Sequence, residues 1–158
     1  MMKKLIMMAT MALGLVAASA PAMAEKAVQV GILTCYVEGG WGLIVTSKKG
    51  MSCRFEHSDG VVEEYNGVIR KYGLDIGKTE SATIVWAVFA PSKVGGVGRL
   101  EGNYAGASGE ASFFVGLGAN LLVGGLDQSF ALQPVSVQQQ TGFDIAVGVS
   151  RLTLRYLR

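Results

Sequence analysis

Apolar residues recur with a period of two along most of the chain after residue 24, in short runs that glycine interrupts. This alternation is typical of β-strands, because successive side chains on a strand point to opposite faces. Clusters that contain glycine separate the runs and indicate turns. The pattern predicts strands over residues 28–37, 43–47, 51–57, 61–72, 81–90, 100–123, 129–137 and 143–157.

Roughly eight to ten short strands at this spacing indicate an all-β domain. The 22 glycines favour a small antiparallel, glycine-rich β-barrel, since strong sheet curvature needs glycine kinks and bulges. A β-sandwich is the alternative. Turns are expected at Gly39-Gly40-Trp41-Gly42, Lys48-Lys49-Gly50 and Ser58-Asp59-Gly60, and Pro134 predicts an edge strand or a bulge.

The first 24 residues have the composition of a secretory signal peptide. Lys3 and Lys4 form a positive start, residues 5–18 are apolar, and Ala22-Met23-Ala24 is a small-x-small cleavage site. The apolar stretch is shorter than the roughly 20 residues that a membrane-spanning helix needs. We therefore expect cleavage after Ala24, export to the periplasm, and one all-β domain over residues 25–158.

Removal of the signal peptide changes the charge balance. The whole chain has 14 basic and 12 acidic residues, a net charge of +2. Without Lys3 and Lys4 the balance is 12 against 12, so no basic tract is left to bind nucleic acid. Arg151, Arg155 and Arg158 are interpreted as part of a solvated strand face.

Both cysteines, Cys35 and Cys53, lie in the predicted domain. An even cysteine count in an exported protein favours a disulfide. This bond would close a loop of about 18 residues and contribute roughly 3 kcal/mol. A metal pair and a catalytic thiol are the alternatives, but two cysteines do not complete a zinc site and His57 is the only histidine. We expect no metal and no cofactor.

Several motifs, spread over nearly all of the predicted domain, carry a family resemblance. They are Gly31-Ile32-Leu33-Thr34-Cys35, Met51-Ser52-Cys53-Arg54-Phe55, Tyr65-Asn66-Gly67, Gly73-Leu74-Asp75-Ile76-Gly77, Trp86-Ala87-Val88-Phe89-Ala90, Leu100-Glu101-Gly102-Asn103-Tyr104 and Leu132-Gln133-Pro134-Val135-Ser136-Val137-Gln138. Together they resemble the proteobacterial domain-of-unknown-function family 992, whose members are secreted or periplasmic. The resemblance implies no established activity and transfers no catalytic residue.

A weaker resemblance begins at Gly73. It rests on the glycines and apolar residues of 73–77, 109–120, 132–134 and 142–154. These stretches are similar to SYLF-type domains and to alphaproteobacterial envelope-integrity β-barrel proteins. Some proteins of that kind are associated with lipid binding or envelope integrity.

Candidate catalytic groups are few and isolated. His57 precedes the Ser58-Asp59-Gly60 turn and is expected at an exposed strand end, which disfavours a role as general base. Glu63 and Glu64 point to opposite faces of a strand and do not form a carboxylate pair. Asp75 fits an Asx-type turn, with a ligand or partner contact as the alternative. We therefore expect no catalysis.

Aromatic residues supply the remaining candidates for binding. Small barrels fill with side chains, whereas slightly larger ones hold one apolar ligand. Trp41 is expected in an exposed turn, where a tryptophan suits a membrane interface or a partner. With Asp75, the candidate ligand or partner contacts are Trp86, Phe89, Tyr104, Phe113 and Phe114, on strands expected to line the barrel interior.

The sequence thus predicts a non-catalytic periplasmic β-barrel that is associated with the cell envelope through an apolar or lipid ligand or through a protein partner. A small outer-membrane barrel is the first alternative. Against it, the chain ends Arg155-Tyr156-Leu157-Arg158 without a terminal aromatic residue, and several strands are shorter than the roughly 9–11 residues needed to span. An uncharacterised enzyme that uses Asp75 or His57 is the second alternative.

Overall fold

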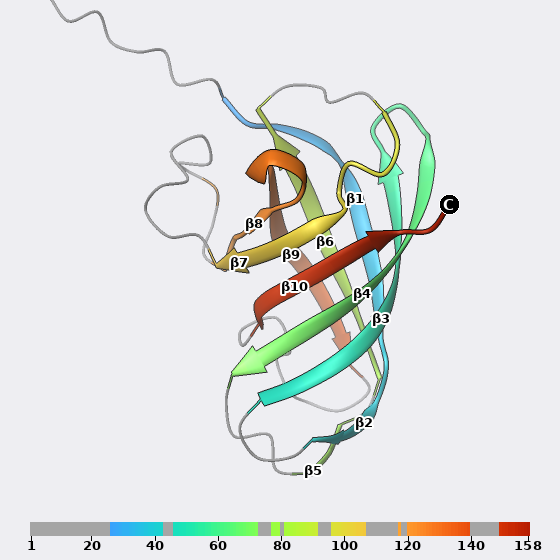
Figure 1. Cartoon of the computed structure of the whole chain (residues 1–158), viewed down its shortest axis with the longest axis vertical. Helices are drawn as coiled ribbons and strands as arrows, with labels where there is room; N and C mark the ends of the chain where they lie inside the picture. The colour runs from blue at the N-terminus through green and yellow to red at the C-terminus, as the bar shows by residue number, and fades with distance from the viewer. Residues whose placement is uncertain are drawn as a thin grey trace, which may run out of the picture.

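The computed structural model describes residues 26–42, 46–72, 77–79, 81–91, 96–106, 117, 120–139 and 149–158. Eight strands in this part form one closed antiparallel barrel in the order β1-β3-β4-β10-β7-β8-β9-β6 (Figure 1). The all-β barrel is therefore confirmed, and the sandwich alternative is wrong. The barrel strands are β1 (Val28–Val37), β3 (Thr46–His57), β4 (Val62–Tyr72), β6 (Ala82–Ala90), β7 (Gly102–Gly106), β8 (Leu122–Gly124), β9 (Phe130–Gln139) and β10 (Val149–Tyr156).

Pairings between distant segments close the barrel. The last strand, β10, lies between β4 and β7, and the first strand, β1, lies between β3 and β6. A closed sheet leaves none of these barrel strands with an unpaired edge that invites aggregation.

The β3–β4 hairpin forms at the predicted Ser58-Asp59-Gly60 turn. Asp59 Oδ1 accepts a hydrogen bond from the backbone N–H of Val61 at 3.1 Å, and Gly60 N donates to His57 O at 3.0 Å. Gly60 has φ +92°, a conformation that glycine adopts without steric cost. These local interactions explain why the turn could be predicted from the sequence.

Two other predicted turns are strands. Lys48-Lys49-Gly50 lies inside β3, where these residues pair with Arg70, Ile69 and Val68 of β4. Gly40–Gly42 forms β2, which pairs with β5 (Gly77–Thr79) in a small second sheet. In both segments, pairing with a partner strand overrides a local composition that favours turns.

Pro134 occupies a bulge and not an edge strand. β9 lies between β8 and β6, and the pairing register with β6 shifts beside Pro134, between Val85 and Trp86. A proline lacks the N–H needed for a sheet ladder, so a bulge inside the sheet accommodates it.

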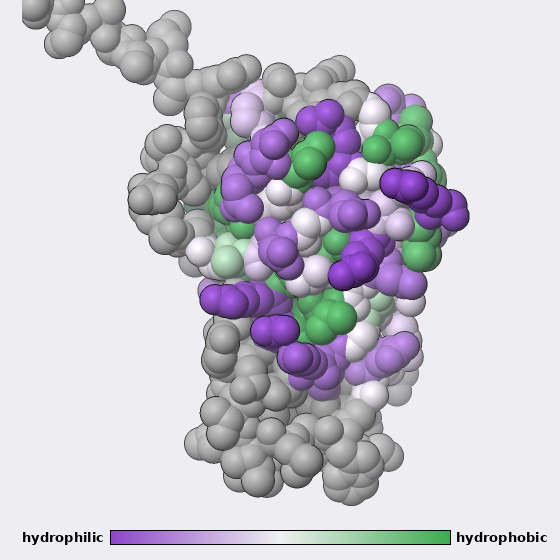
Figure 2. All heavy atoms as spheres, viewed as in Figure 1, coloured by the Kyte–Doolittle hydropathy of each residue, from purple (hydrophilic) through white to green (hydrophobic). Residues whose placement is uncertain are grey.

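The barrel interior is an apolar core, and the outer face is polar on β3, β4 and β10. On β3 and β4, Cys53, Phe55 and Tyr65 are buried, whereas Arg54 and Glu64 are exposed. Figure 2 shows the face on which β10, β4 and β3 lie nearest the viewer, and it is mostly hydrophilic with isolated apolar side chains.

The predicted disulfide is present. Cys35 of β1 and Cys53 of β3 are direct register partners and are bonded, and both are buried. The bond therefore links two strands inside the core.

The helical content of the described residues includes one short 3-10 turn, Leu126–Gln128, between β8 and β9. Among the residues that the structure describes, none forms a helix long and apolar enough to cross a membrane.

Candidate functional site

A carboxylate is buried at one end of the barrel. Strand alternation on β4 turns Glu63 inward together with Tyr65, while Glu64 points outward. Glu63 retains only 3% of its surface exposed to solvent. A buried carboxylate is costly unless hydrogen bonds compensate for the lost water, so its surroundings identify the site.

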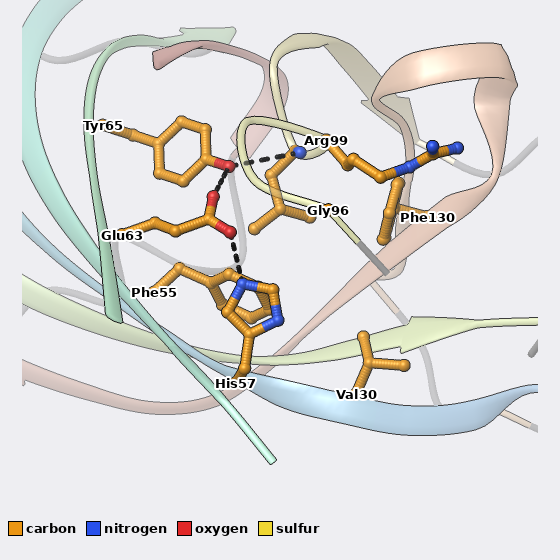
Figure 3. Close-up of a pocket in the computed structure, with 9 residues that line it drawn as sticks. Val30, Phe55, His57, Glu63, Tyr65, Gly96, Arg99 and Phe130 are labelled. Atoms are coloured by element: carbon orange, nitrogen blue, oxygen red, sulfur yellow. Dashed lines mark hydrogen bonds and ion pairs between the residues drawn. The ribbon is translucent and has the colours of Figure 1, made fainter. Parts of the chain in front are cut away.

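Three donors surround the Glu63 carboxylate. Oε1 is hydrogen-bonded to His57 Nε2, and Oε2 accepts from the hydroxyl of Tyr65 (Figure 3). Oε2 also accepts from the backbone N–H of Gly98 at 2.9 Å. These donors come from the end of β3, from β4 and from the segment that precedes β7, so the carboxylate joins three parts of the chain.

The segment 96–101 is clasped onto the barrel end by further hydrogen bonds. Leu100 N donates to the hydroxyl of Tyr65 at 3.4 Å, and Tyr104 Oη donates to Leu100 O at 2.8 Å. The Glu101 carboxylate accepts from Tyr156 N at 3.0 Å. We call Glu63, His57, Tyr65 and the segment 96–101 the carboxylate clasp.

Both tyrosines of this region hold their protons firmly. Burial raises the pKa of Tyr65 above its ordinary value, and the hydrogen bond and charge of Glu63 raise it further. Burial raises the pKa of Tyr104 in the same direction. Each hydroxyl is therefore a donor at neutral pH and not a base.

The space beside the clasp is small. Apolar side chains such as Phe55 and Phe130 line it together with His57 and Arg99 (Figure 3). Its volume is about 10 Å³, which is close to what one water molecule requires. Arg99 Nε is buried there and has no hydrogen-bond partner among the described residues, so a single water fits this cavity better than an organic ligand.

Metal binding has no support in the described part of the chain. Among these residues no group of three or more His, Cys, Asp or Glu side chains is arranged to hold an ion. The Glu63 carboxylate instead has hydrogen-bond partners within the protein on both of its oxygens.

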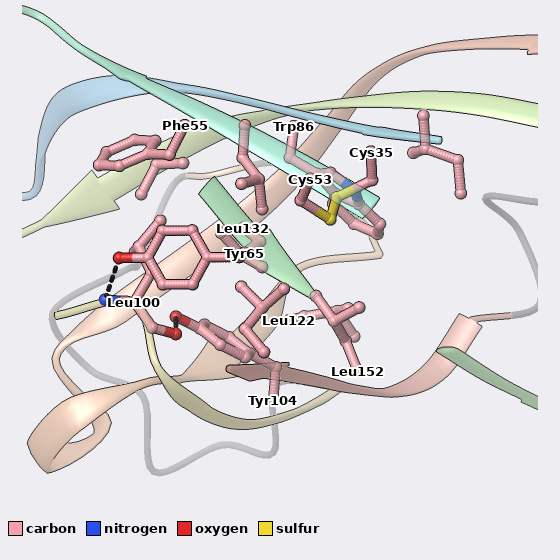
Figure 4. Packing of buried hydrophobic residues seen from close by; sticks show 14 of the residues in the cluster. Cys35, Cys53, Phe55, Tyr65, Trp86, Leu100, Tyr104, Leu122, Leu132 and Leu152 are labelled. Carbon is pink, nitrogen blue, oxygen red and sulfur yellow. Dashed lines mark hydrogen bonds between the residues drawn. A yellow bond between two sulfur atoms is a disulfide. The ribbon is translucent and has the colours of Figure 1, made fainter. Parts of the chain in front are cut away.

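The predicted aromatic contacts separate into different environments. Trp86 and Tyr104 lie in the barrel core with at most 1% exposure (Figure 4). Trp86 Nε1 is buried and has no hydrogen-bond partner in the part of the chain that the structure describes. Phe89 does not line the interior as expected: it is partly buried in a second cluster with Leu121 and Ala131, because alternation along β6 turns it away from the face of Trp86.

The remaining predicted contacts, Asp75, Phe113 and Phe114, lie outside the described residues. The side chain of Trp41 is also outside them, although its backbone forms part of β2. The predicted aromatic group is therefore not brought together as one site in the described structure.

The side chain of His57 is largely buried and not exposed as the sequence predicted. Its side chain is only 16% exposed and packs against Phe55, with ring centroids 4.2 Å apart. One feature of the sequence pointed to this site. Alternation along the strand places Glu63 on the same face as Tyr65 and Ile69. A charge among inward-facing residues indicates a buried partner, but the partner itself cannot be read from that pattern.

Comparison with family models gives one match: the model described as "Protein of unknown function (DUF992)" matches residues 14–155. No curated protein and no solved structure matches the chain. These comparisons do not show the second resemblance, to SYLF-type and envelope-integrity proteins.

Proposed function

Because the chain belongs to the family described as "Protein of unknown function (DUF992)", its relatives supply no activity, and we propose from its geometry that it is an exported, non-catalytic β-barrel of the periplasm. In this proposal it serves the cell envelope by binding an envelope component, either lipid or protein, at its outer surface. The observation that carries the proposal is that apolar side chains fill the barrel interior, while the outer face of β3, β4 and β10 is polar.

This polarity favours a barrel surrounded by water over the outer-membrane alternative. A membrane-spanning barrel presents an apolar band to lipid and has a polar interior. Here Ser52, Arg54, Glu64 and Asn66 are exposed on the outer face, whereas large apolar side chains fill the interior. On β3 and β4 the arrangement is therefore the reverse, whereas Phe89, Val123 and Ala131 of β6, β8 and β9 form an apolar cluster outside the central core.

The filled interior also favours binding at the outer surface. Trp86, Tyr65 and Tyr104 occupy the core with almost no exposure, and the cavity beside the clasp has the volume of one water. In the described part of the barrel an apolar ligand would have to displace these side chains.

The carboxylate clasp supports a role without catalysis. A catalytic acid or base needs a free position from which to reach a substrate. Glu63 uses both oxygens on internal donors, and the hydroxyl of Tyr65 donates to Glu63 and accepts from Leu100 N. Groups committed in this way hold a loop and are poorly placed for chemistry.

Cell fractionation combined with mass spectrometry of the purified protein tests the proposal. We expect a chain that begins at Glu25, carries an intact disulfide and is found in the periplasm, with a membrane-associated part that salt releases. A deletion of residues 2–24 is the matched control and should stay in the cytosol. An uncleaved cytosolic protein would refute the proposal, and release by detergent alone would favour the outer-membrane barrel.

A further inference from the structure

Charged residues occupy only one side of the barrel wall. Among the barrel strands that the structure describes, every Lys, Arg, Asp and Glu lies on β3, β4 or β10, and these three strands are neighbours in the barrel (Figure 1). The other five strands, β7, β8, β9, β6 and β1, also follow one another around the barrel and contain none of these residues. The wall therefore has a charged side and an uncharged side.

Part of the uncharged side presents exposed side chains. On β1 and β6 outward residues alternate with buried ones, and register pairs Thr34 with Val85 and Tyr36 with Thr83. Tyr36 is 52% exposed, and Val135, in the bulge of β9 beside Val85, is 56% exposed. We call this surface the uncharged face; it consists of Ile32, Thr34, Tyr36, Thr83, Val85 and Val135.

The uncharged face differs from the apolar cluster that lies next to it on the same side. In that cluster Phe89 and Val123 already pack against the buried residues Leu121 and Ala131. On the uncharged face, Tyr36 and Val135 keep about half of their surface in water. A contiguous exposed surface of this kind, bordered by polar residues, is typical of an interaction site.

The composition of the uncharged face favours a protein partner over a lipid one. The centre of a protein–protein interface is depleted in charged residues and enriched in aromatic ones, and Tyr36 with its uncharged neighbours has this character. Thr34 and Thr83 carry hydroxyl groups that need hydrogen-bond partners once water leaves. Acyl chains offer no such partner, whereas a protein surface does.

The distribution of charge favours a second copy of this chain as that protein. In a two-fold dimer the same surface lies on both sides of the interface, so a charge near the axis meets its own sign. The uncharged face avoids this repulsion. At its border with β3, Thr34 pairs with Arg54, and Arg54 forms an ion pair with Glu56 at 3.1 Å. This rim carries both signs, so two copies of it do not repel.

The uncharged face and its rim have the dimensions of a small interface. Neighbouring strands are about 4.8 Å apart and each residue rises about 3.3 Å, so four strands over six residues cover roughly 20 Å by 20 Å. Stable interfaces bury about 800 Å² on each partner, and weak, reversible ones bury less than about 600 Å². The area available here is therefore that of a reversible association.

We propose that two copies of the barrel associate through the uncharged face as a reversible two-fold dimer. The predicted domain has equal numbers of basic and acidic residues, so no long-range repulsion opposes the encounter. In such a dimer the outer faces of β4 and β10 point away from the partner and stay accessible to the proposed envelope component.

Sedimentation velocity of the purified protein tests the dimer at concentrations from about 1 µM to about 200 µM, which bracket the affinity of so small an interface. We expect the sedimentation coefficient to rise with concentration to that of a dimer and no further, and to do so equally in about 0.5 M salt. Tyr36→Lys and Val135→Lys should each weaken association about tenfold or more, because like charges then face each other. Val68→Lys, at an exposed valine of β4, is the matched control and should dimerise normally.

Circular dichroism and urea unfolding establish that each variant is folded, and Thr34→Lys replaces either variant that is not. A monomer at every concentration would overturn the dimer, and so would species larger than a dimer. Equal losses in Val68→Lys and in the face variants, or no loss in the face variants, would place the contact elsewhere and refute the proposal. A monomer that floats with phosphatidylcholine vesicles, and that Tyr36→Lys releases, would show lipid as the occupant instead. These results are independent of the fractionation that tests the proposed function.

Discussion

Glu63 shows how one buried charge can organise a barrel end. Its carboxylate receives hydrogen bonds from His57, Tyr65 and the backbone of Gly98, and these contacts offset the water lost on burial. Because the donors belong to three different segments, the buried carboxylate is fully stabilised only when all three segments are in place. The contribution of Glu63 is therefore to fix the segment 96–101 against β3 and β4.

Replacing Glu63 should be among the most destabilising single substitutions in the described chain. Glu63→Ala leaves three inward donors without their acceptor, and we expect a loss of about 3 kcal/mol or more in the free energy of unfolding. Urea-induced unfolding measures the loss. Glu64→Ala, one residue along on the outer face, should change stability by no more than about 0.5 kcal/mol. Equal losses in the two variants would contradict the clasp.

Tyr65 and Tyr104 should make the protein sensitive to alkali. The pKa of each is raised in the folded state above the ordinary value of 10.0. Above pH 10 the unfolded chain loses these protons while the folded chain keeps them, so the unfolded state binds fewer protons. The stabilisation is full below pH 10 and falls as pH rises further, by about 1.4 kcal/mol per pH unit for each tyrosine.

Urea unfolding between about pH 9 and pH 12 measures this slope, which is the change in the free energy of unfolding per pH unit. Tyr65→Phe and Tyr104→Phe should each make the slope shallower, even though each variant also loses a hydrogen bond at every pH. Tyr36→Phe is the matched control, because the Tyr36 side chain is exposed. An unchanged slope in both core variants would show that these tyrosines do not set the alkaline limit.

At the scale of the strand, several glycines permit close contact between backbones. Gly124 of β8 pairs with Tyr104 of β7, and a Cβ at position 124 would lie 2.0 Å from the carbonyl oxygen of Asn103. A side chain there cannot be accommodated by a rotamer change, because the obstacle is backbone. The requirement for glycine at position 124 therefore comes from the close approach of the neighbouring strand and not from a local turn.

Gly124→Ala should destabilise the barrel by about 2 kcal/mol or more, since overpacking against a fixed neighbour forces the backbone apart. The midpoint of thermal unfolding gives the comparison. Gly106→Ala on β7 is the matched control, because a Cβ at position 106 meets nothing within 4 Å, and it should be close to neutral. A larger loss for Gly106→Ala than for Gly124→Ala would contradict this reading of the β7–β8 contact.

At the scale of the whole molecule, closure depends on the last strand. β10 fills the position between β4 and β7, and its buried residues Leu152 and Leu154 belong to the central core. Without β10 the sheet would have two unpaired edges and an open core. The C-terminal end of the chain is therefore an integral part of the fold.

Deletion of residues 149–158 should abolish cooperative unfolding and make the chain susceptible to proteolysis. A synthetic peptide of residues 149–158, added to the truncated protein, should restore part of the protection by occupying the gap. A shorter deletion of Arg158 alone is the control and should leave a cooperative transition. A truncated protein that still unfolds cooperatively would show that the barrel does not require β10.

By itself, the sequence determined the features that depend on near neighbours. The period-two alternation gave an all-β chain with apolar and polar strand faces, the glycine content favoured a barrel, and Asp59 and Gly60 marked the β3–β4 turn. The disulfide was predicted from the expectation of export and from the presence of two cysteines, and it is present. Alternation also placed Glu63 and Glu64 on opposite faces, because that relation needs only one strand.

Only the tertiary structure decided which distant residues meet. The continuation of β3 through Lys48 and Gly50, the burial of His57 against Glu63, and the alignment of Thr34 with Val85 all depend on strand register. Register is set by packing and pairing across the whole barrel, and a shift of one residue would reverse every face. No local pattern contains that information, so the clasp and the uncharged face appear only once the barrel is closed.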